Sequence, residues 1–73
     1  MKHLTQLNPG ESGVMLSLAG DDAFSRRLMA MGFVPDTPIT LLRRAPMGDP
    51  LLISLRGVRL MLRRTGAERI LLK

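Results

Sequence analysis

The side chains that could carry out catalysis or hold a metal ion are few in this sequence. Histidine occurs once, as His3, and cysteine is absent. A His/Cys nucleophile pair or a thiolate zinc cluster therefore cannot be assembled, and one histidine is too few for the histidine and carboxylate set that iron(II) favours. Asp21 and Asp22 are adjacent, but capping of a following helix explains them. The sequence thus predicts no catalytic residue, no metal site, no cofactor and no enzyme.

Arginine is the abundant residue type with chemical potential, and its distribution is uneven. The formal net charge is +5, and from Thr37 onward eight Lys and Arg residues accompany only Asp49 and Glu68. A basic half of this kind favours an acidic partner, such as nucleic acid, anionic lipid or an acidic protein face. A basic surface that only keeps a small domain soluble is the alternative, and composition leaves both open.

The length allows one small domain. A chain of 73 residues hides only about 60% of the surface that its unfolded form exposes, and 45% hydrophobic residues suffice for one modest core. We therefore expect a single domain over residues 1–73. No apolar run reaches the roughly 18 residues of a membrane helix, and Asn8-Pro9-Gly10 comes before any signal-peptide core. These features predict a cytoplasmic protein without direct membrane insertion.

The first half of the chain holds one strand pattern and one helix pattern. The apolar-rich segment Val14–Leu18 predicts a strand. Asp21 or Asp22 can cap a helix that runs to about Met31, since Gly32 then offers the left-handed residue that often ends a helix.

The spacing within this helix separates a core side from an outer side. On the outer side Asp22 and Arg26 are four residues apart, which predicts an ion pair, and Met29 falls on the same side. The stripe that faces the core is predicted to consist of Phe24, Leu28 and Met31.

The second half of the chain is predicted to consist of strands and turns. The predicted strands are residues 37–44, 51–55, 58–62 and 69–72. Arg56-Gly57 is typical of a two-residue hairpin turn, residues 45–50 form a loop that contains two prolines, and residues 65–67 form another turn. Together these elements indicate a mainly β fold, a small SH3-like barrel of about five strands with one short α-helix after the first strand.

The hairpin turn sets a register for the side chains around it. If Leu55 pairs with Val58, then Ile53 faces Leu60 on the inner side. Extended to the preceding strand, this register predicts an outer face made of Leu42, Arg44, Leu52, Arg56, Arg59, Met61 and Arg63. Mixed arginine and apolar surfaces are typical of protein interfaces, whereas burial of the apolar members under a second layer is the alternative.

The aromatic content argues against two kinds of binding barrel. Peptide-binding SH3 domains use an aromatic-lined groove, but this chain has no Trp or Tyr. Barrels that bind single-stranded nucleic acid combine basic grooves with stacking aromatics, and only Phe24 and Phe33 are present, of which Phe24 is assigned to the core.

Several segments of the chain are similar to the FeoA family. Residues 45–51, Ala-Pro-Met-Gly-Asp-Pro-Leu, resemble the family's Ala-Pro-Leu-Gly-Asp-Pro-Ile loop and are the most specific part. Residues 24–37 resemble its helix and turn, residues 57–63 its next hairpin, and residues 7–13 its usual opening. Asp36 stands where the family often has glycine, and aspartate tolerates a left-handed turn better than most residues.

The resemblance implies an SH3-like barrel that is an accessory to bacterial ferrous-iron uptake. Its partner is then expected to be the FeoB permease, through the cytosolic GTP-binding region. Partner contacts are predicted at Met29, Met47, Arg56, Arg59, Met61 and Arg63. A free-standing basic barrel that binds nucleic acid is the alternative function, and self-association stays open.

Overall fold

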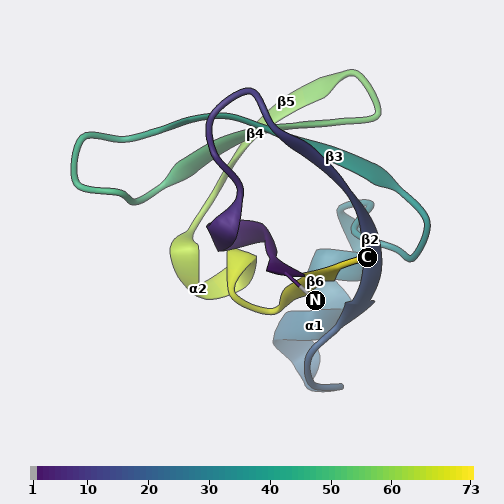
Figure 1. The fold of residues 1–73 in the computed structure, drawn as a ribbon. Helices are drawn as coiled ribbons and strands as arrows, with labels where there is room; N and C mark the ends of the chain where they lie inside the picture. Colours follow the sequence, from purple (N-terminus) through teal and green to yellow (C-terminus); the bar gives the residue numbers. More distant parts are fainter. Residues whose placement is uncertain (1) are drawn as a thin grey trace.

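A computed structural model describes residues 2–73, which form a curved antiparallel sheet flanked by short helices (Figure 1). The elements are β1 (Lys2–His3), the 3-10 turn η1 (Leu4–Gln6), β2 (Ser12–Leu18), α1 (Ala23–Ala30), β3 (Pro38–Arg44), β4 (Leu51–Leu55), β5 (Val58–Leu62), α2 (Arg64–Ala67) and β6 (Ile70–Leu72). The strand order is β1-β6-β2-β3-β4-β5, and every neighbouring pair is antiparallel.

The strand count and the place of the helix differ from the sequence prediction. The sheet has six strands rather than about five, because the short segment Lys2–His3 pairs with β6. The helix α1 consequently follows the second strand rather than the first. Residues 65–67, predicted as a turn, belong to the single helical turn of α2. No helix within residues 2–73 is long and apolar enough to cross a membrane.

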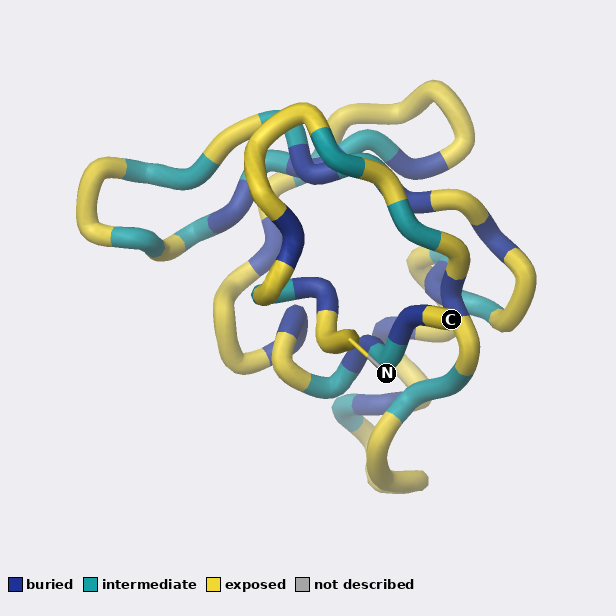
Figure 2. The backbone as a smooth tube through the Cα atoms, viewed as in Figure 1, coloured by how far each residue is buried: buried dark blue, intermediate teal, exposed yellow. Residues whose placement is uncertain are grey.

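The inner side of the curved sheet carries the hydrophobic core (Figure 2). Strand alternation turns Ile39 and Leu41 of β3 and Leu51 and Ile53 of β4 inward, and each of them is fully buried. The alternation predicted for these strands is therefore confirmed. The other buried apolar side chains are Leu4, Leu7, Met15, Leu28, Phe33, Leu55, Leu62, Ala67, Ile70 and Leu72.

The helix α1 begins where the sequence predicted, because Asp22 caps it. The Asp22 carboxylate accepts a hydrogen bond from the Ser25 backbone N–H at 3.1 Å, which satisfies one of the donors left free by the first helical turn. The predicted pair between Asp22 and Arg26 is wrong. Arg26 donates instead to the carbonyl oxygen of Asp21 at 2.8 Å, and Asp22 pairs with Arg69 at 2.6 Å.

The core stripe of α1 is shorter than the spacing predicted. Leu28 is buried and Phe24 packs partly against the core, but Met31 is 43% exposed. The helix ends just before Met31, and Gly32 adopts a φ of 112°, which turns the chain. Phe33 then enters the core in place of Met31, with no exposed surface.

Two predicted turns use left-handed backbone, as their residues allow. Arg56 and Gly57 have φ values of 53° and 80°, which is the type I′ geometry that matches the twist of a two-residue hairpin. Leu55 pairs with Val58, so β4 and β5 have the predicted register. Asp36 also has a positive φ of 69°, in agreement with its expected tolerance of this conformation.

A β-bulge in β3 corrects the predicted outer face. The pairing register with β4 shifts between Leu41 and Arg43, so Leu42 is the extra residue. Side chains after a bulge change sides, because the extra residue offsets the two-residue alternation. Arg43 therefore pairs with Leu52 on the outer face, and Arg44 points to the other side. The prediction that Arg44 lies on the outer face is wrong for this reason, whereas the bulge does not contradict the prediction for Leu42.

The re-aimed Arg44 holds the N-terminal segment against the sheet. Its guanidinium nitrogen Nη2 donates to the carbonyl oxygens of Thr5 and Leu7, each at 2.6 Å. Thr5 lies in η1 and Leu7 follows directly after it. Hydrogen bonds from a charged donor to partly buried carbonyls are stronger than neutral ones, so this contact connects β3 to η1.

Replacement of Arg44 should destabilise the fold, whereas replacement of its neighbour should not. We expect Arg44→Met to lower the free energy of unfolding by about 1–3 kcal/mol, because two carbonyl oxygens lose a charged donor. Arg43→Met is the matched control, since the Arg43 side chain is exposed on the outer face. Urea denaturation of both variants measures the difference, and equal losses would contradict the assigned role of the bulge.

Candidate protein-interaction surfaces

The outward side chains of β3, β4 and β5 form a mixed basic and apolar surface, which we name the outer hairpin face. It consists of Arg43, Leu52, Ser54, Arg59 and Met61. The pairs Leu52–Met61 and Ser54–Arg59 are opposite one another in the β4–β5 ladder, as the sequence predicted. Met61 is 57% exposed and Leu52 is half-buried, so an apolar pair is accessible between the arginines.

A shallow hollow of about 390 Å³ lies at one end of the outer hairpin face. Its lining residues are Arg43, Arg44, Ala45, Pro46, Leu52 and Met61. Met47, at the tip of the adjoining loop between β3 and β4, is 90% exposed. An apolar hollow edged by the exposed residue Arg43, with an exposed methionine next to it, can accept an apolar side chain from an acidic surface.

The two remaining predicted arginines lie at opposite ends of β5. Arg56 is in the hairpin turn, and its guanidinium lies 3.5 Å from the Thr37 hydroxyl oxygen, at the limit of hydrogen bonding. Arg63 directly follows β5, and its carbonyl oxygen accepts hydrogen bonds from the backbone N–H groups of Gly66 and Ala67 in α2. Both side chains belong to exposed residues, so the positive charge extends along the whole strand.

The arginines on this side of the molecule are not neutralised by carboxylates. Within residues 2–73, the ion pairs are Lys2–Glu11, Arg64–Glu68, Arg69–Asp22 and Lys73–Asp36. Asp49, in the loop beside the face, accepts a hydrogen bond from the backbone N–H of Arg64 at 2.9 Å. The described part of the chain therefore places no carboxylate against Arg43, Arg56, Arg59 or Arg63, and their charges add to a local positive potential.

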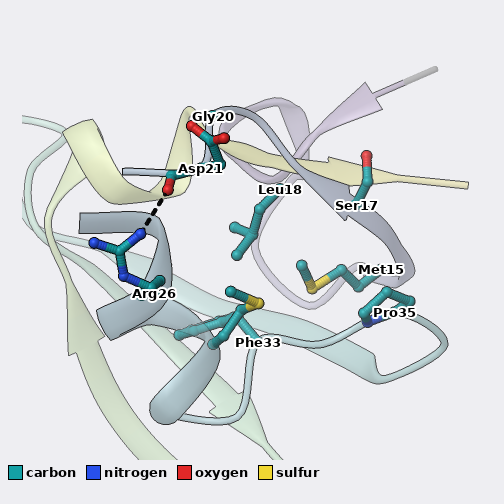
Figure 3. Close-up of a pocket in the computed structure, with 9 residues that line it drawn as sticks. Met15, Ser17, Leu18, Gly20, Asp21, Arg26, Phe33 and Pro35 are labelled. Atoms are coloured by element: carbon teal, nitrogen blue, oxygen red, sulfur yellow. Dashed lines mark hydrogen bonds between the residues drawn. The ribbon is translucent and has the colours of Figure 1, made fainter. Parts of the chain in front are cut away.

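The structure separates Met29 from the other predicted contact residues. Met29 lies on α1, which Figure 1 shows at the far end of the molecule from the β4–β5 hairpin. It lines a second hollow of about 490 Å³, which we name the α1–β2 hollow (Figure 3). The other lining residues are Met15, Ser17, Leu18, Gly20, Asp21, Arg26, Phe33 and Pro35. The two hollows share no lining residue.

Sequence reasoning missed Arg43 and the α1–β2 hollow. Arg43 was missed because the bulge at Leu42 leaves no mark on the pattern of apolar and polar residues. The hollow was missed because its floor comes from distant segments, including Met15 of β2 and Phe33 after α1. No local spacing brings these residues together, although the apolar-Gly-apolar-x-Pro turn was visible in the sequence.

The charged groups near the start of α1 are held by one another. Arg69 donates to the Asp22 carboxylate at 2.6 Å, and its guanidinium lies 4.7 Å from the centre of the Phe24 ring. The hydrogen bond from Arg69, with a second from the Ser25 backbone N–H, lowers the pKa of Asp22 to about 2. Arg69 is therefore occupied within the fold, unlike the arginines of the outer hairpin face.

Neither hollow offers the groups that catalysis or metal binding needs. No cluster of three or more His, Cys, Asp or Glu side chains occurs within residues 2–73. The α1–β2 hollow has one carboxylate at its rim, that of Asp21, and the hollow at the outer hairpin face has none.

Comparison with known families assigns the chain. The model of the FeoA domain matches residues 2–73. The chain belongs to the FeoA family. This assignment confirms the resemblance seen in the loop at residues 45–51.

Three relatives of this FeoA-family chain illustrate the similarity. The Fe(2+) transport protein A/Fe(2+) transporter FeoB fusion protein of Porphyromonas gingivalis is 33% identical over 67 residues, or 92% of this chain, which spans only 8% of that protein. FeoA from Chlorobium tepidum has a TM-score of 0.87 at 37% identity, covering 97% of this chain and 68% of that one. The zinc-complexed Stenotrophomonas maltophilia FeoA, an SH3 domain protein, has a TM-score of 0.86 at 30% identity, covering 100% and 91%. The SH3-like fold is thereby confirmed.

The Asp22–Arg69 pair predicts a specific acid dependence of FeoA stability. The pKa of Asp22 is about 2 in the folded state, whereas an unperturbed aspartate has a pKa of 3.8. The contribution of Asp22 to folding stability is therefore complete above about pH 4 and is lost as the pH falls towards 2. Asp22→Asn retains a capping side chain but has no charge to titrate. We expect the variant to be less stable at pH 7 and to lose less stability between about pH 4 and pH 2, as measured by urea denaturation. Parallel pH profiles would contradict this assignment.

Proposed function

We propose that this FeoA-family protein binds the cytosolic region of a FeoB-type iron permease through the outer hairpin face, and that it acts in the cytoplasm as a non-enzymatic regulator. The observation that carries the proposal is a surface of unneutralised arginines around an exposed apolar pair, Leu52 and Met61. Arginine and methionine are enriched at protein interfaces, where an apolar centre is bordered by charged groups. We also propose that residues 1–73 act as one domain.

The fusion relative supports FeoB as the partner. In the Porphyromonas gingivalis protein, the FeoA-like segment and the FeoB transporter belong to one polypeptide. A covalent connection makes contact between two modules intramolecular, with a high effective concentration of each for the other. A separate FeoA chain lacks this advantage, so the same contact needs an interface with its own affinity, such as the outer hairpin face.

The contact is proposed to include the predicted residues on and beside this face. Arg59 and Met61 occupy its centre, Arg56 and Arg63 its two ends, and Met47 the tip of the adjoining loop. Met29 lies elsewhere, beside the α1–β2 hollow. A partner that binds the outer hairpin face would contact Met29 only if it also extends to α1. Contact at Met29 therefore stays a separate prediction.

The position of the aromatic residues does not favour nucleic acid as the ligand. Phe33 is fully buried, and Phe24 is partly buried with the Arg69 guanidinium against its ring. Neither phenylalanine is placed for a base to stack on it, which is the usual source of affinity in barrels that bind single strands. Phosphate binding by arginine alone would fall steeply with salt, whereas a partly apolar protein contact falls less steeply.

Charge reversal on the outer hairpin face should weaken partner binding without unfolding the protein. We expect Arg59→Glu combined with Arg63→Glu to reduce affinity for the soluble cytosolic region of a FeoB-type permease by at least about tenfold, because like charges replace complementary ones. Calorimetric titration at two salt concentrations, with and without a GTP analogue, measures the affinity. The melting temperature should change little, since both residues are exposed.

A matched control separates the position of the charges from their number. Lys2→Glu combined with Arg27→Glu changes the net charge by the same amount on exposed residues of β1 and α1. We expect this control to bind nearly as the unchanged protein does. Equal weakening in both double variants would assign the interaction to net charge alone and would remove the outer hairpin face from the proposal.

A further inference from the structure

The strand β5 lies at one end of the sheet and has a free edge. It pairs with β4 on one side and is the last strand in the sheet order. In a two-residue hairpin, Leu55 and Val58 form the first hydrogen-bonded pair, so ladder hydrogen bonds recur at alternate residues. The backbone groups of Leu60 and Leu62 therefore face β4. Those of Arg59 and Met61 point away from it.

These outward backbone groups have no partner in the described part of the chain. No hydrogen bond outside the β4–β5 ladder involves the backbone N–H or C=O of Arg59 or Met61. The edge ends at Arg63, whose carbonyl oxygen is taken by the backbone N–H groups of Gly66 and Ala67. Two donors and two acceptors are thus presented in a row, which is the template that an added strand requires.

The side chains beside this edge favour an apolar and acidic strand. On the inner side, Val58 is 59% exposed and Leu60 is half-buried, and both lie on the same side of β5 as the buried Leu62. On the outer side, Met61 is 57% exposed and is flanked in sequence by Arg59 and Arg63, which have no carboxylate partner. An added strand would cover Val58 and Leu60 on one face and would meet positive charge on the other.

We propose that β5 receives an extended segment of the partner protein as a seventh strand, and that this segment alternates apolar residues with Asp or Glu. The alternation places apolar side chains over Val58 and Leu60 and carboxylates beside Arg59 and Arg63. This inference rests on the proposed function in assigning the segment to a partner protein. It adds the mode of binding and the chemistry of the segment.

A second copy of this chain is a poorer occupant of the same edge. Antiparallel pairing of β5 with itself brings Arg59 and Arg63 of both copies onto one face, and like charges across a strand pair are destabilising. Charged residues on an edge strand commonly prevent such self-pairing. The same arginines attract an acidic strand, so charge complementarity selects the heterologous segment.

Amide exchange of the isotope-labelled full chain tests this inference without the permease. The probe is a blocked hexapeptide, Glu-Val-Glu-Ile-Glu-Val, and its control has Lys in place of Glu. At saturating probe, we expect exchange to slow by about tenfold or more at the amides of Arg59 and Met61, because new hydrogen bonds protect them. The amides of Leu60 and Leu62 are already in the ladder and should change little. Unchanged exchange at Arg59 and Met61, or equal protection by the Lys peptide, overturns the proposal.

Two substitutions at one position separate the backbone from the side chain. Met61→Pro removes the outward N–H and is tolerated on an edge strand, whereas Met61→Ala retains the N–H and removes the side chain. We expect the proline variant to bind the acidic peptide at least about tenfold more weakly than the alanine variant. Protection of the Leu60 amide reports whether the hairpin remains folded. Equal affinities in folded variants would show contact by side chains alone and would overturn strand addition.

The results distinguish this inference from the proposed function. Binding of the permease region without protection at Arg59 and Met61 overturns strand addition and leaves the proposed function intact. Protection by the acidic peptide without any binding of the permease region supports strand addition and contradicts the proposed function. Protection that rises with protein concentration alone would assign the edge to a second copy of this chain and would overturn the inference.

Discussion

The β-bulge in β3 determines which of two neighbouring arginines lies on the outer face of the sheet and which holds the N-terminal segment. Because Leu42 is an extra residue, Arg44 rather than Arg43 points to the inner side of the sheet. Arg44 donates to the carbonyl oxygens of Thr5 and Leu7 and thereby holds η1. Arg43 joins the outer hairpin face. Without the bulge, a regular strand would send Arg44 outward and leave those two carbonyl oxygens without their charged donor.

The rest of the outer surface depends on the β4–β5 hairpin, in which the register is not shifted by a bulge. The left-handed turn at Arg56 and Gly57 allows β4 and β5 to pair without interruption, so Arg59 and Met61 lie together on the outer side. The carboxylates that pair with cations do so elsewhere in the described chain, as Asp22 does with Arg69. This chain of the FeoA family thus presents positive charge, apolar surface and an open strand edge on a single element, β5.

Local patterns predicted what depends on local physics. The turn at Arg56, the positive φ at Asp36 and the cap at Asp22 follow from the backbone preferences of a few adjacent residues. Tertiary packing decided the rest. Met31 has the spacing of a core residue, but the chain turns away and Phe33 fills the space. The bulge in β3, the strand at Lys2–His3 and the α1–β2 hollow depend on contacts between distant segments, which a single sequence does not show.

We propose that the outer hairpin face, rather than the α1–β2 hollow, contacts the iron permease. The most direct measurement is nuclear magnetic resonance mapping of the isotope-labelled chain with the soluble cytosolic region of a FeoB-type permease. The largest chemical-shift changes are expected in β4, β5 and the loop at residues 45–50. Changes confined to α1 and residues 15–21 would contradict this proposal and would assign the contact to the α1–β2 hollow.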